Sequence, residues 1–338
     1  MSGGRRLGWF VGGAVATVAV GRIAARATPW PSALLIRSVF DRGAAATRAE
    51  FERHPPKAPV DERLDVPYAD DDSGTGDDTT LDVFGPAGVE RPLPTVVWIH
   101  GGAWISGSKD DVAPYLRILA AEGYRTIGLN YTIAPEATYP TAVRQLGTAL
   151  AYVRDHAAEL GVDPTRIVLA GDSAGAQLAS QLAVLMTNPE YAALVDMEPA
   201  LGPRQLVGVV LQCGVYDLRR MASLRGILAW GFKSALWAYT GTRDWATGYQ
   251  GSTMSTIDFV TKDFPPVYIS GGNADGLTWI ESIPMAQALQ RVEVETRTRF
   301  YAADHEPPLP HEYQFHLDLD AAQLSLRDTL AFLKHVTR

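Results

Sequence analysis

The sequence predicts an α/β protein with a mostly parallel central sheet flanked by helices. Two places in the chain carry this prediction. An apolar run over residues 166–170 feeds a tight turn and then a helical pattern over 174–187, and a second apolar run over 94–99 leads into a glycine-rich turn. Units of this kind recur along the chain, and alternation of strands and helices is typical of parallel sheets built from crossover connections.

The first 27 residues resemble a targeting segment. Arg5 and Arg6 precede an apolar stretch from Leu7 to Val20, and Ala25-Arg-Ala27 offers small residues for cleavage. The stretch has 14 residues, which is short against the roughly 20 that span a bilayer. Residues 1–27 are therefore predicted to be a signal peptide or a membrane anchor, with a helix packed on the domain as the alternative.

Basic residues gather in the same part of the chain. Residues 1–60 carry nine basic and three acidic side chains, a charge of +6, so the rest of the chain is at about −14. A basic, apolar N-terminal region beside an acidic body favours a membrane-anchored or secreted protein. A cytoplasmic location is the alternative.

A helix is predicted over residues 30–51, because Leu34, Leu35, Val39 and Phe40 follow helical spacing.

The run over 94–99 is predicted to be a buried strand that leads into His100-Gly-Gly-Ala-Trp104. A glycine-rich turn at a strand end can aim several backbone N–H groups at one point, as the stabilisation of an oxyanion requires. Gly101 is expected to permit the turn and His100 to fix the loop by hydrogen bonding. A phosphate-binding turn is the alternative, but the glycine patterns of such turns are absent from the sequence. The predicted donors are the N–H groups of Gly102, Ala103 and Ala174.

Residues 171–175 read Gly-Asp-Ser-Ala-Gly, directly after the run over 166–170. Between a strand and a helix this pattern predicts a nucleophile elbow, in which the hydroxyl of Ser173 is exposed on a strained corner. Gly171 and Gly175 fit this reading, because side chains there would collide with the backbone that crosses the corner. Ser173 is the predicted nucleophile, and a chance match in a small-residue loop is the alternative.

An acid that orients the catalytic base is expected after the serine in the chain. A short strand over 265–270 ends in a loop that carries Asp275, which is the predicted acid. Asp217, at the end of the preceding strand, is the main competitor, and Asp304 is third. A purely structural role for Asp275 would be to cap a helix that starts at about Leu277.

The base is sought among seven histidines. Three of them lie between an alternating run over 294–301 and a helical pattern over 317–336. His311 is the predicted base, since it follows a proline-rich turn just before the helix. His305 is the second choice, and His316 is assigned to the start of the helix. The histidines predicted to lie on the surface are His54, His156 and His335.

Together these motifs resemble the hormone-sensitive-lipase family of α/β-hydrolase esterases. The resemblance runs from about Asp65 to the C-terminus and includes Asn130–Glu136, Tyr139-Pro140 and Gly161–Arg166. It implies the α/β-hydrolase fold and a serine hydrolase that cleaves carboxylic esters of small or medium size through an acyl-enzyme. The departures from the family pattern are Ala103 in place of a glycine, and Gln145 and Trp279 in place of acidic residues.

In the family, N-terminal helices help to form a cap over the substrate pocket. The resemblance implies such helices in residues 28–62 and a catalytic domain over 63–338. A second piece of cap is expected as an insertion at about 218–262, which interrupts the strand–helix alternation between the sixth and seventh core strands. The aromatic residues of this insertion either line an acyl or alcohol pocket or pack in the core.

The overall composition limits the partners. The chain is 46% hydrophobic and 20% charged, as is ordinary for a globular protein. A net charge of −8 argues against nucleic acid. Cys213 is the single cysteine, so no intramolecular disulfide forms, and it is predicted to be a buried core residue. Without a Cys/His cluster, neither a metal nor a cofactor is expected.

The expected partner is therefore a small-molecule ester, and the oligomeric state is left open. Two other classes of function stay open from the sequence. One is an amidase that acts on small aryl amides or formamides. The other is a non-catalytic ligand-binding protein on the same fold, since a fold alone does not fix a function.

Overall fold

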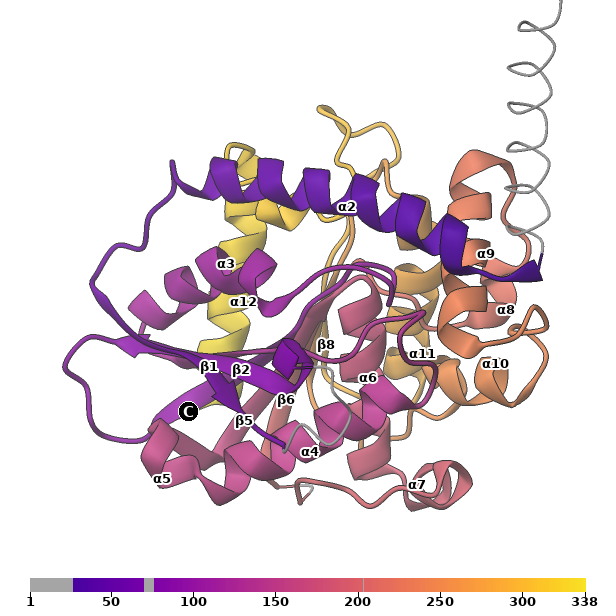
Figure 1. The fold of residues 1–338 in the computed structure, drawn as a ribbon. Helices are drawn as coiled ribbons and strands as arrows, with labels where there is room; N and C mark the ends of the chain where they lie inside the picture. The colour runs from indigo at the N-terminus through magenta and orange to yellow at the C-terminus, as the bar shows by residue number, and fades with distance from the viewer. Residues whose placement is uncertain (1–26, 70–75, 203) are drawn as a thin grey trace, which may run out of the picture.

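The computed structural model describes residues 27–69, 76–202 and 204–338, which fold around an eight-stranded sheet (Figure 1). The strand order is β1-β2-β4-β3-β5-β6-β7-β8. The strands β3 to β8 run parallel to one another, and β2 pairs antiparallel with both β1 and β4. The strands are β1 (Val60–Pro67), β2 (Thr80–Pro86), β3 (Leu93–Ile99), β4 (Arg125–Leu129), β5 (Val162–Asp172), β6 (Leu206–Gln212), β7 (Val267–Ser270) and β8 (Thr296–Arg299).

Helices cover both faces of the sheet. The longer ones are α2 (Trp30–Phe51), α3 (Lys109–Ala121), α4 (Thr141–Asp155), α6 (Ala174–Thr187), α9 (Gly226–Thr240), α11 (Ile283–Arg291) and α12 (Asp320–Val336). The shorter ones are α5 (Ala157–Leu160), α7 (Pro189–Val195), α8 (Leu218–Met221) and α10 (Tyr249–Met254), with single turns at Gly76–Thr79, Thr256–Asp258, Thr278–Ser282 and Tyr313–Phe315.

Alternate side chains of each central strand enter different cores. In β3, Val97 and Ile99 pack in the larger core with α4, α6 and α11, whereas Val96 and Trp98 pack in a second core with α3 and α12. This period of two is the geometry of a strand buried on both faces. The predicted α/β-hydrolase architecture, with a mostly parallel sheet between helical layers, is confirmed.

Most predicted elements are present, with differences at their ends. The helices over 30–51 and 174–187 have the predicted bounds. The strand predicted over 166–170 is longer, because Val162 already pairs with Leu93 of β3. The last helix begins at residue 320 instead of 317, since the N–H of Leu319 closes a turn onto the carbonyl of His316. β1 begins at Val60, inside the range expected for N-terminal helices.

Two segments from distant parts of the chain lie side by side above the sheet. α2 crosses the top of the view in Figure 1 and contacts both α3 and α9. α9 belongs to the segment between β6 and β7, which also holds α8 and α10. The predicted signal peptide or anchor lies outside the described residues, apart from Ala27. Among the helices of the described ranges, none has the length and hydropathy needed to cross a bilayer.

Candidate active site

The residues predicted to do chemistry meet at the carboxyl ends of the central parallel strands. The segment from His100 follows β3, Ser173 follows β5, and the loop with Asp275 follows β7. His311 comes from the connection between β8 and α12. The carboxyl edge of a parallel sheet is where open α/β folds place their ligands, so the topology alone brings these four parts of the chain together.

Ser173 occupies a strained corner between β5 and α6. Its backbone has φ 51° and ψ −118°, outside the regions that ordinary residues adopt, at a cost of about 1–3 kcal/mol. Its N–H donates to the carbonyl of Gln212 at 2.8 Å, which ties the corner to the end of β6. A Cβ at Gly175 would lie 2.0 Å from the carbonyl oxygen of Ile99. The corner is therefore possible only because glycine follows the serine so closely.

The three predicted catalytic side chains form one hydrogen-bonded chain. His311 Nε2 lies 2.9 Å from Ser173 Oγ, and His311 Nδ1 lies 2.7 Å from Asp275 Oδ2. Nδ1 must donate to the carboxylate, so Nε2 is left to accept the proton of the serine hydroxyl. Asp275 Oδ1 also accepts the N–H of Leu277 at 2.9 Å. The helix-cap role weighed for Asp275 is thus present together with the contact to histidine.

The surroundings of His311 favour its charged form. Burial lowers the pKa of the imidazole, but the nearby carboxylate of Asp275, with those of Glu312 and Asp172, outweighs this and raises the pKa to about 9. The carboxylates therefore stabilise an imidazolium at this position, which is the species a general base becomes when it removes a proton.

The competing candidates make their contacts elsewhere. Asp217 caps α8 and pairs with Arg219 at 2.7 Å and Arg220 at 3.1 Å. The ring of His305 packs against Tyr301, with ring centroids 4.6 Å apart. His316 Nδ1 lies 2.9 Å from Glu50 Oε2 of α2.

The three histidines predicted to lie on the surface differ in exposure. His156 is exposed and stacks on Tyr152. His54 and His335 are half-buried at the surface, where each pairs with an exposed carboxylate, so the surface prediction is confirmed for all three. The half-burial follows from these ion pairs, which hold each ring against a neighbouring segment.

The loop after β3 has the backbone geometry of a donor turn. Gly102, Ala103 and Trp104 have φ values of 100°, 51° and 61° in succession. Within the described part of the chain, no hydrogen bond uses the N–H of Gly102, Ala103 or Ala174. Buried N–H groups without partners are rare in proteins, so this trio is suited to binding an oxygen atom beside Ser173.

His100 holds this loop in place as a neutral residue. Its Nδ1 donates to the carbonyl of Gly101 at 2.8 Å, and its ring stacks on Tyr131 with centroids 4.4 Å apart. Burial lowers the pKa of His100 to about 4. The hydrogen-bonding role predicted for His100 is confirmed.

Asp172 and Glu312 form a pair of acidic residues next to the triad, and the sequence did not predict this pair. Asp172 is buried and accepts from Trp98 Nε1 at 2.7 Å and from the N–H of Gly101 at 2.9 Å. Burial and the nearby Glu312 carboxylate raise the pKa of Asp172 well above its usual range. Glu312 Oε1 also lies 3.8 Å from His311 Nε2. The position of Glu312 next to the predicted base was the one available signal.

Two departures from the family pattern have local replacements. Gln145 accepts the N–H of Thr132 at 2.8 Å and donates to its hydroxyl, so an amide takes the place of the acid. Glu281, two residues after Trp279, accepts the N–H groups of Tyr216 and Asp217 at 2.8 and 2.7 Å. Burial raises the pKa of Glu281 to about 8. The π-helical turn over Thr278–Ser282 aims this later acid inward.

Cys213 is buried, as predicted. Burial raises the pKa of its thiol well above the usual range, which disfavours a thiolate nucleophile.

Two groups in the described residues have spacings that a metal ion could use. One joins Cys213, His311 and Glu312, and the other joins Glu50, His54 and Asp318. In the first, His311 already bonds Ser173 and Asp275. In the second, Asp318 already pairs with Arg53 and His54. Both groups are thus satisfied by protein partners, and the absence of a metal remains a prediction.

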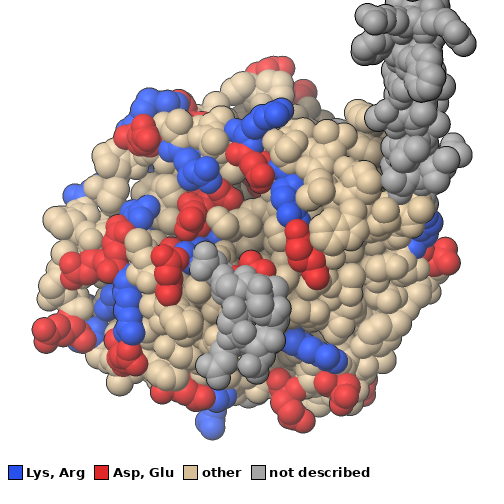
Figure 2. All heavy atoms as spheres, in the orientation of Figure 1, with Lys and Arg blue, Asp and Glu red and all other residues tan. Residues whose placement is uncertain are grey.

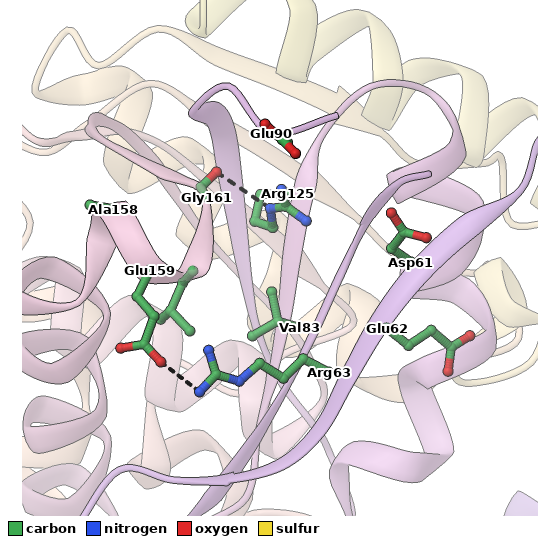
Figure 3. A pocket seen from close by; sticks show the side chains of 10 residues that line it. Asp61, Glu62, Arg63, Val83, Glu90, Arg125, Ala158, Glu159 and Gly161 are labelled. Atoms are coloured by element: carbon green, nitrogen blue, oxygen red, sulfur yellow. Dashed lines mark hydrogen bonds and ion pairs between the residues drawn. The ribbon is translucent and has the colours of Figure 1, made fainter. Parts of the chain in front are cut away.

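A hollow of about 310 Å³ lies at the other end of the sheet (Figure 3). It is lined by residues of β1, β2 and α5 and by Arg125 at the amino end of β4. Ion pairing of Arg63 with Glu159 at 2.6 Å spans part of it, and Arg125 donates to the carbonyl of Gly161. Since Ser173 follows the carboxyl end of β5, this hollow takes no part in the site.

Comparisons with known proteins agree with the fold and the motifs. A segment of 109 residues is 39% identical to carboxylesterase NlhH of Mycobacterium tuberculosis, and it spans 32% of this chain and 34% of that protein. Esterase B of Lactobacillus rhamnosis is similar in structure with a TM-score of 0.77 at 21% identity, over 92% of this chain and 96% of that one. An esterase of Pyrobaculum calidifontis has a TM-score of 0.69 at 22% identity, over 94% and 97% of the two chains.

The match to a protein family covers the larger part of the chain. The BD-FAE family matches residues 81–289, from the second strand of the sheet to α11, and this range includes Ser173 and Asp275. The resemblance inferred from the motifs is confirmed by these matches, and the chain belongs to the BD-FAE family with an α/β-hydrolase fold.

Proposed function

We propose that the protein hydrolyses carboxylic esters of small or medium size with Ser173 as nucleophile, His311 as base and Asp275 as the acid that orients it. The observation that carries the proposal is the unbroken contact from Asp275 Oδ2 through His311 to Ser173 Oγ, with distances of 2.7 and 2.9 Å. It is supported by the names of the relatives, which are a carboxylesterase and several esterases.

The reaction proceeds in two halves. Ser173 Oγ attacks the ester carbonyl while His311 Nε2 takes its proton, and the N–H groups of Gly102, Ala103 and Ala174 stabilise the oxyanion. His311 then protonates the departing alcohol and leaves an acyl-enzyme on Ser173. Water repeats the sequence, with His311 as base, and releases the acid.

The cap over this site consists, in our proposal, of α2 and the insertion over 218–262. Contact between α2 and α9 supports a single cover made from both segments. Trp104 of the donor loop stacks on Tyr239 of α9 with centroids 5.4 Å apart, which links the cover to the oxyanion loop. Aromatic residues of the insertion are therefore suited to meet the acyl or alcohol part of an ester.

We also propose that the mature protein works outside the cytoplasm or tethered to a membrane through its N-terminal segment. Its support is the Arg-flanked apolar stretch from Leu7 to Val20. Fractionation of cells that express the full chain, with the mass of the product, tests this. Full-length protein in the soluble cytoplasm alone would contradict it.

A chain-length series of p-nitrophenyl esters, run beside aryl amides and formamides, tests the proposed activity. Ester hydrolysis that peaks at short or medium chains, with covalent labelling of Ser173 by a fluorophosphonate, is the expected result. Faster turnover of amides would favour the amidase. Binding of esters without turnover or labelling would favour a ligand-binding protein.

A further inference from the structure

Seven large apolar side chains of α2 and α9 are exposed to solvent. Three of them are more than half exposed, namely Leu35 at 59%, Val39 at 55% and Ile227 at 77%. Monomeric soluble proteins rarely expose large apolar patches unless these bind something. We call this group the α2–α9 apolar face, and its members are Trp30, Leu34, Leu35, Val39, Phe40, Ile227 and Trp230.

The apolar face is not the side of α2 that the fold buries. Ala33 and Ile36 pack inward, while Leu35 and Val39 lie four residues apart on an outer row. The first three turns of α2 are thus apolar on the side toward the protein and on the side toward solvent. α2 contacts α9, so the two helices that carry these exposed side chains lie side by side (Figure 1).

The face carries no acidic residue in either helix segment. Between Trp30 and Phe40 the one charged residue is Arg37, and within α9 it is Lys233. Figure 2 shows a wide, mostly uncharged area at the upper right, whereas charged side chains crowd the left half of the view. Residues 1–60 are at +6 while the rest of the chain is at about −14. Arg37 is paired with Glu136 at 2.6 Å, so the positive charge beside the face comes from Arg42 and from the four arginines of residues 1–26. An apolar face next to these arginines favours a partner surface that is apolar and negatively charged.

The chain that leads into α2 points to the same kind of surface. The apolar stretch from Leu7 to Val20, flanked by arginines, ends ten residues before Trp30. At about 3.3–3.6 Å per residue, even a fully extended link places the apolar face within roughly 35 Å of that stretch. Stable attachment to a bilayer takes two signals, such as an apolar insertion and a basic patch.

We propose that the α2–α9 apolar face docks on the surface of an anionic lipid bilayer. The apolar side chains enter the boundary between headgroups and acyl chains, and the basic residues of the N-terminal region face the headgroups. The fit rests on the exposed row of α2, its neighbour α9, the missing acidic charge and the apolar stretch that precedes them.

Docking there would place the bilayer next to the active site. Arg37 of α2 donates to the carbonyl of Ile105 at 2.6 Å, and Ser106 donates to Asp41 at 2.8 Å. The docked helix is thus bonded to the loop that carries the predicted oxyanion donors. Given the proposed function, the docked enzyme takes apolar esters directly from the membrane, and this second step rests on that function.

The single buried cysteine allows a direct test of docking with the full chain. Leu35→Cys is labelled with a polarity-sensitive fluorophore, and Leu194→Cys, which is 47% exposed on α7, serves as the matched control. Vesicles that mix phosphatidylglycerol with phosphatidylcholine should shift the emission of the Leu35 label to the blue and leave the Leu194 label unchanged. Vesicles of phosphatidylcholine alone should give a weaker shift.

Three outcomes would overturn docking. An unshifted Leu35 label on protein that sediments with vesicles would mean that the N-terminal stretch tethers the chain without the face touching lipid. A shift that depends on protein concentration and needs no vesicles would assign the face to a second copy of the chain. A label shielded at all concentrations without lipid would assign it to residues 1–26.

Activity gives a second readout. Leu35→Glu with Val39→Glu should slow the hydrolysis of a long-chain ester embedded in anionic vesicles by about tenfold or more, and leave hydrolysis of p-nitrophenyl acetate unchanged. Leu194→Glu is the matched control for both substrates. Equal rates on vesicles would overturn the membrane supply of substrate. A wild-type chain without activity on either ester would contradict the proposed function while leaving the labelling result intact.

Discussion

The carboxyl end of the sheet and the helical cover above it are built in different ways. At the strand ends the backbone departs from ordinary conformations at Ser173, Ala103 and Trp104, and polar side chains such as Asp172, Ser173 and Asp275 are buried. The proposed cover is made of regular helices, and seven of their large apolar side chains are exposed. In our proposal the two regions have separate tasks: the backbone geometry set by glycine-rich motifs carries the chemistry, and the exposed side chains of the cover govern which substrates reach it.

The largest expected difference between the two regions comes from two substitutions. One removes the proposed nucleophile at a strand end, and the other removes a large side chain from the proposed cover. Ser173→Ala should lower kcat for a soluble ester by about 10³–10⁶-fold, because the nucleophile of a triad is lost. Trp230→Ala, exposed on α9, should change kcat for the same ester by less than about threefold. Initial rates with both variants, and circular dichroism as a folding control, supply the measurement. Comparable losses in the two variants would mean that the cover takes part in the chemistry.

The next prediction tests which of two acidic residues at neighbouring strand ends, Asp275 or Asp217, orients the catalytic histidine. Asp275→Asn should lower kcat by about 10²–10⁴-fold, because an amide cannot hold the imidazole in the required tautomer as a carboxylate does. Asp217→Asn should keep most of the activity, since Asp217 caps α8 and pairs with Arg219 and Arg220. Single-turnover rates of both variants decide it. An active Asp275→Asn beside an inactive Asp217→Asn would reverse the assignment of the acid.

Local motifs account for the part of the site that the sequence predicts. Ser173, His100 and the donor loop lie within a few residues of the strands that place them, and the glycines there are demanded by contacts such as Gly175 with the Ile99 carbonyl. Asp275 and His311 follow from chain order and strand ends. Relations of this kind, between residues that are close in the chain or follow a fixed order, can be recognised in a single sequence.

The rest depends on segments that are far apart in the chain. Glu312 lies next to Asp172, although the two residues are 140 positions apart in the chain. Glu281 accepts hydrogen bonds from Tyr216 and Asp217 because it lies in a π-helical turn, and no pattern in the sequence predicted this turn. The helical spacing in α2 predicted its length but not the side that it buries. Exposure depends on where α9 and the loop after β3 come to lie, so the apolar face became visible only in the folded chain.

The pH dependence sharpens the contrast within the strand-end region. A general base must be neutral, so kcat/KM for an uncharged ester should fall as the pH drops below the His311 pKa of about 9. Glu312→Gln removes a carboxylate 3.8 Å from His311 Nε2 that favours the cation. The pKa then falls, and the acid limb should move to lower pH by up to about one unit. Glu306→Gln, exposed in the same connection, is the control, and a limb that stays in place for Glu312→Gln would contradict the electrostatic role.

The smallest expected effect tests whether the two regions are coupled at all. Arg37 of α2 donates to the carbonyls of Ile105 at 2.6 Å and Ala134 at 2.8 Å, and it pairs with Glu136. Arg37→Gln loses these charge-assisted bonds and loosens the loop before Ile105, so the oxyanion donors are held less firmly. A loss of about 1 kcal/mol in transition-state stabilisation corresponds to a fall in kcat of about fivefold.

KM for a short ester should hardly change in Arg37→Gln, because the affected donors act on the oxyanion and not on the bound ester. Arg42→Gln, which removes a basic residue from the same helix one turn beyond Val39, should leave kcat for the soluble ester as it is. If Arg37→Gln raises KM with kcat unchanged, the bond from α2 shapes the entrance and not the donor loop. In that case α2 would affect only the access of the substrate, and the residues at the strand ends would perform the chemistry without support from the cover.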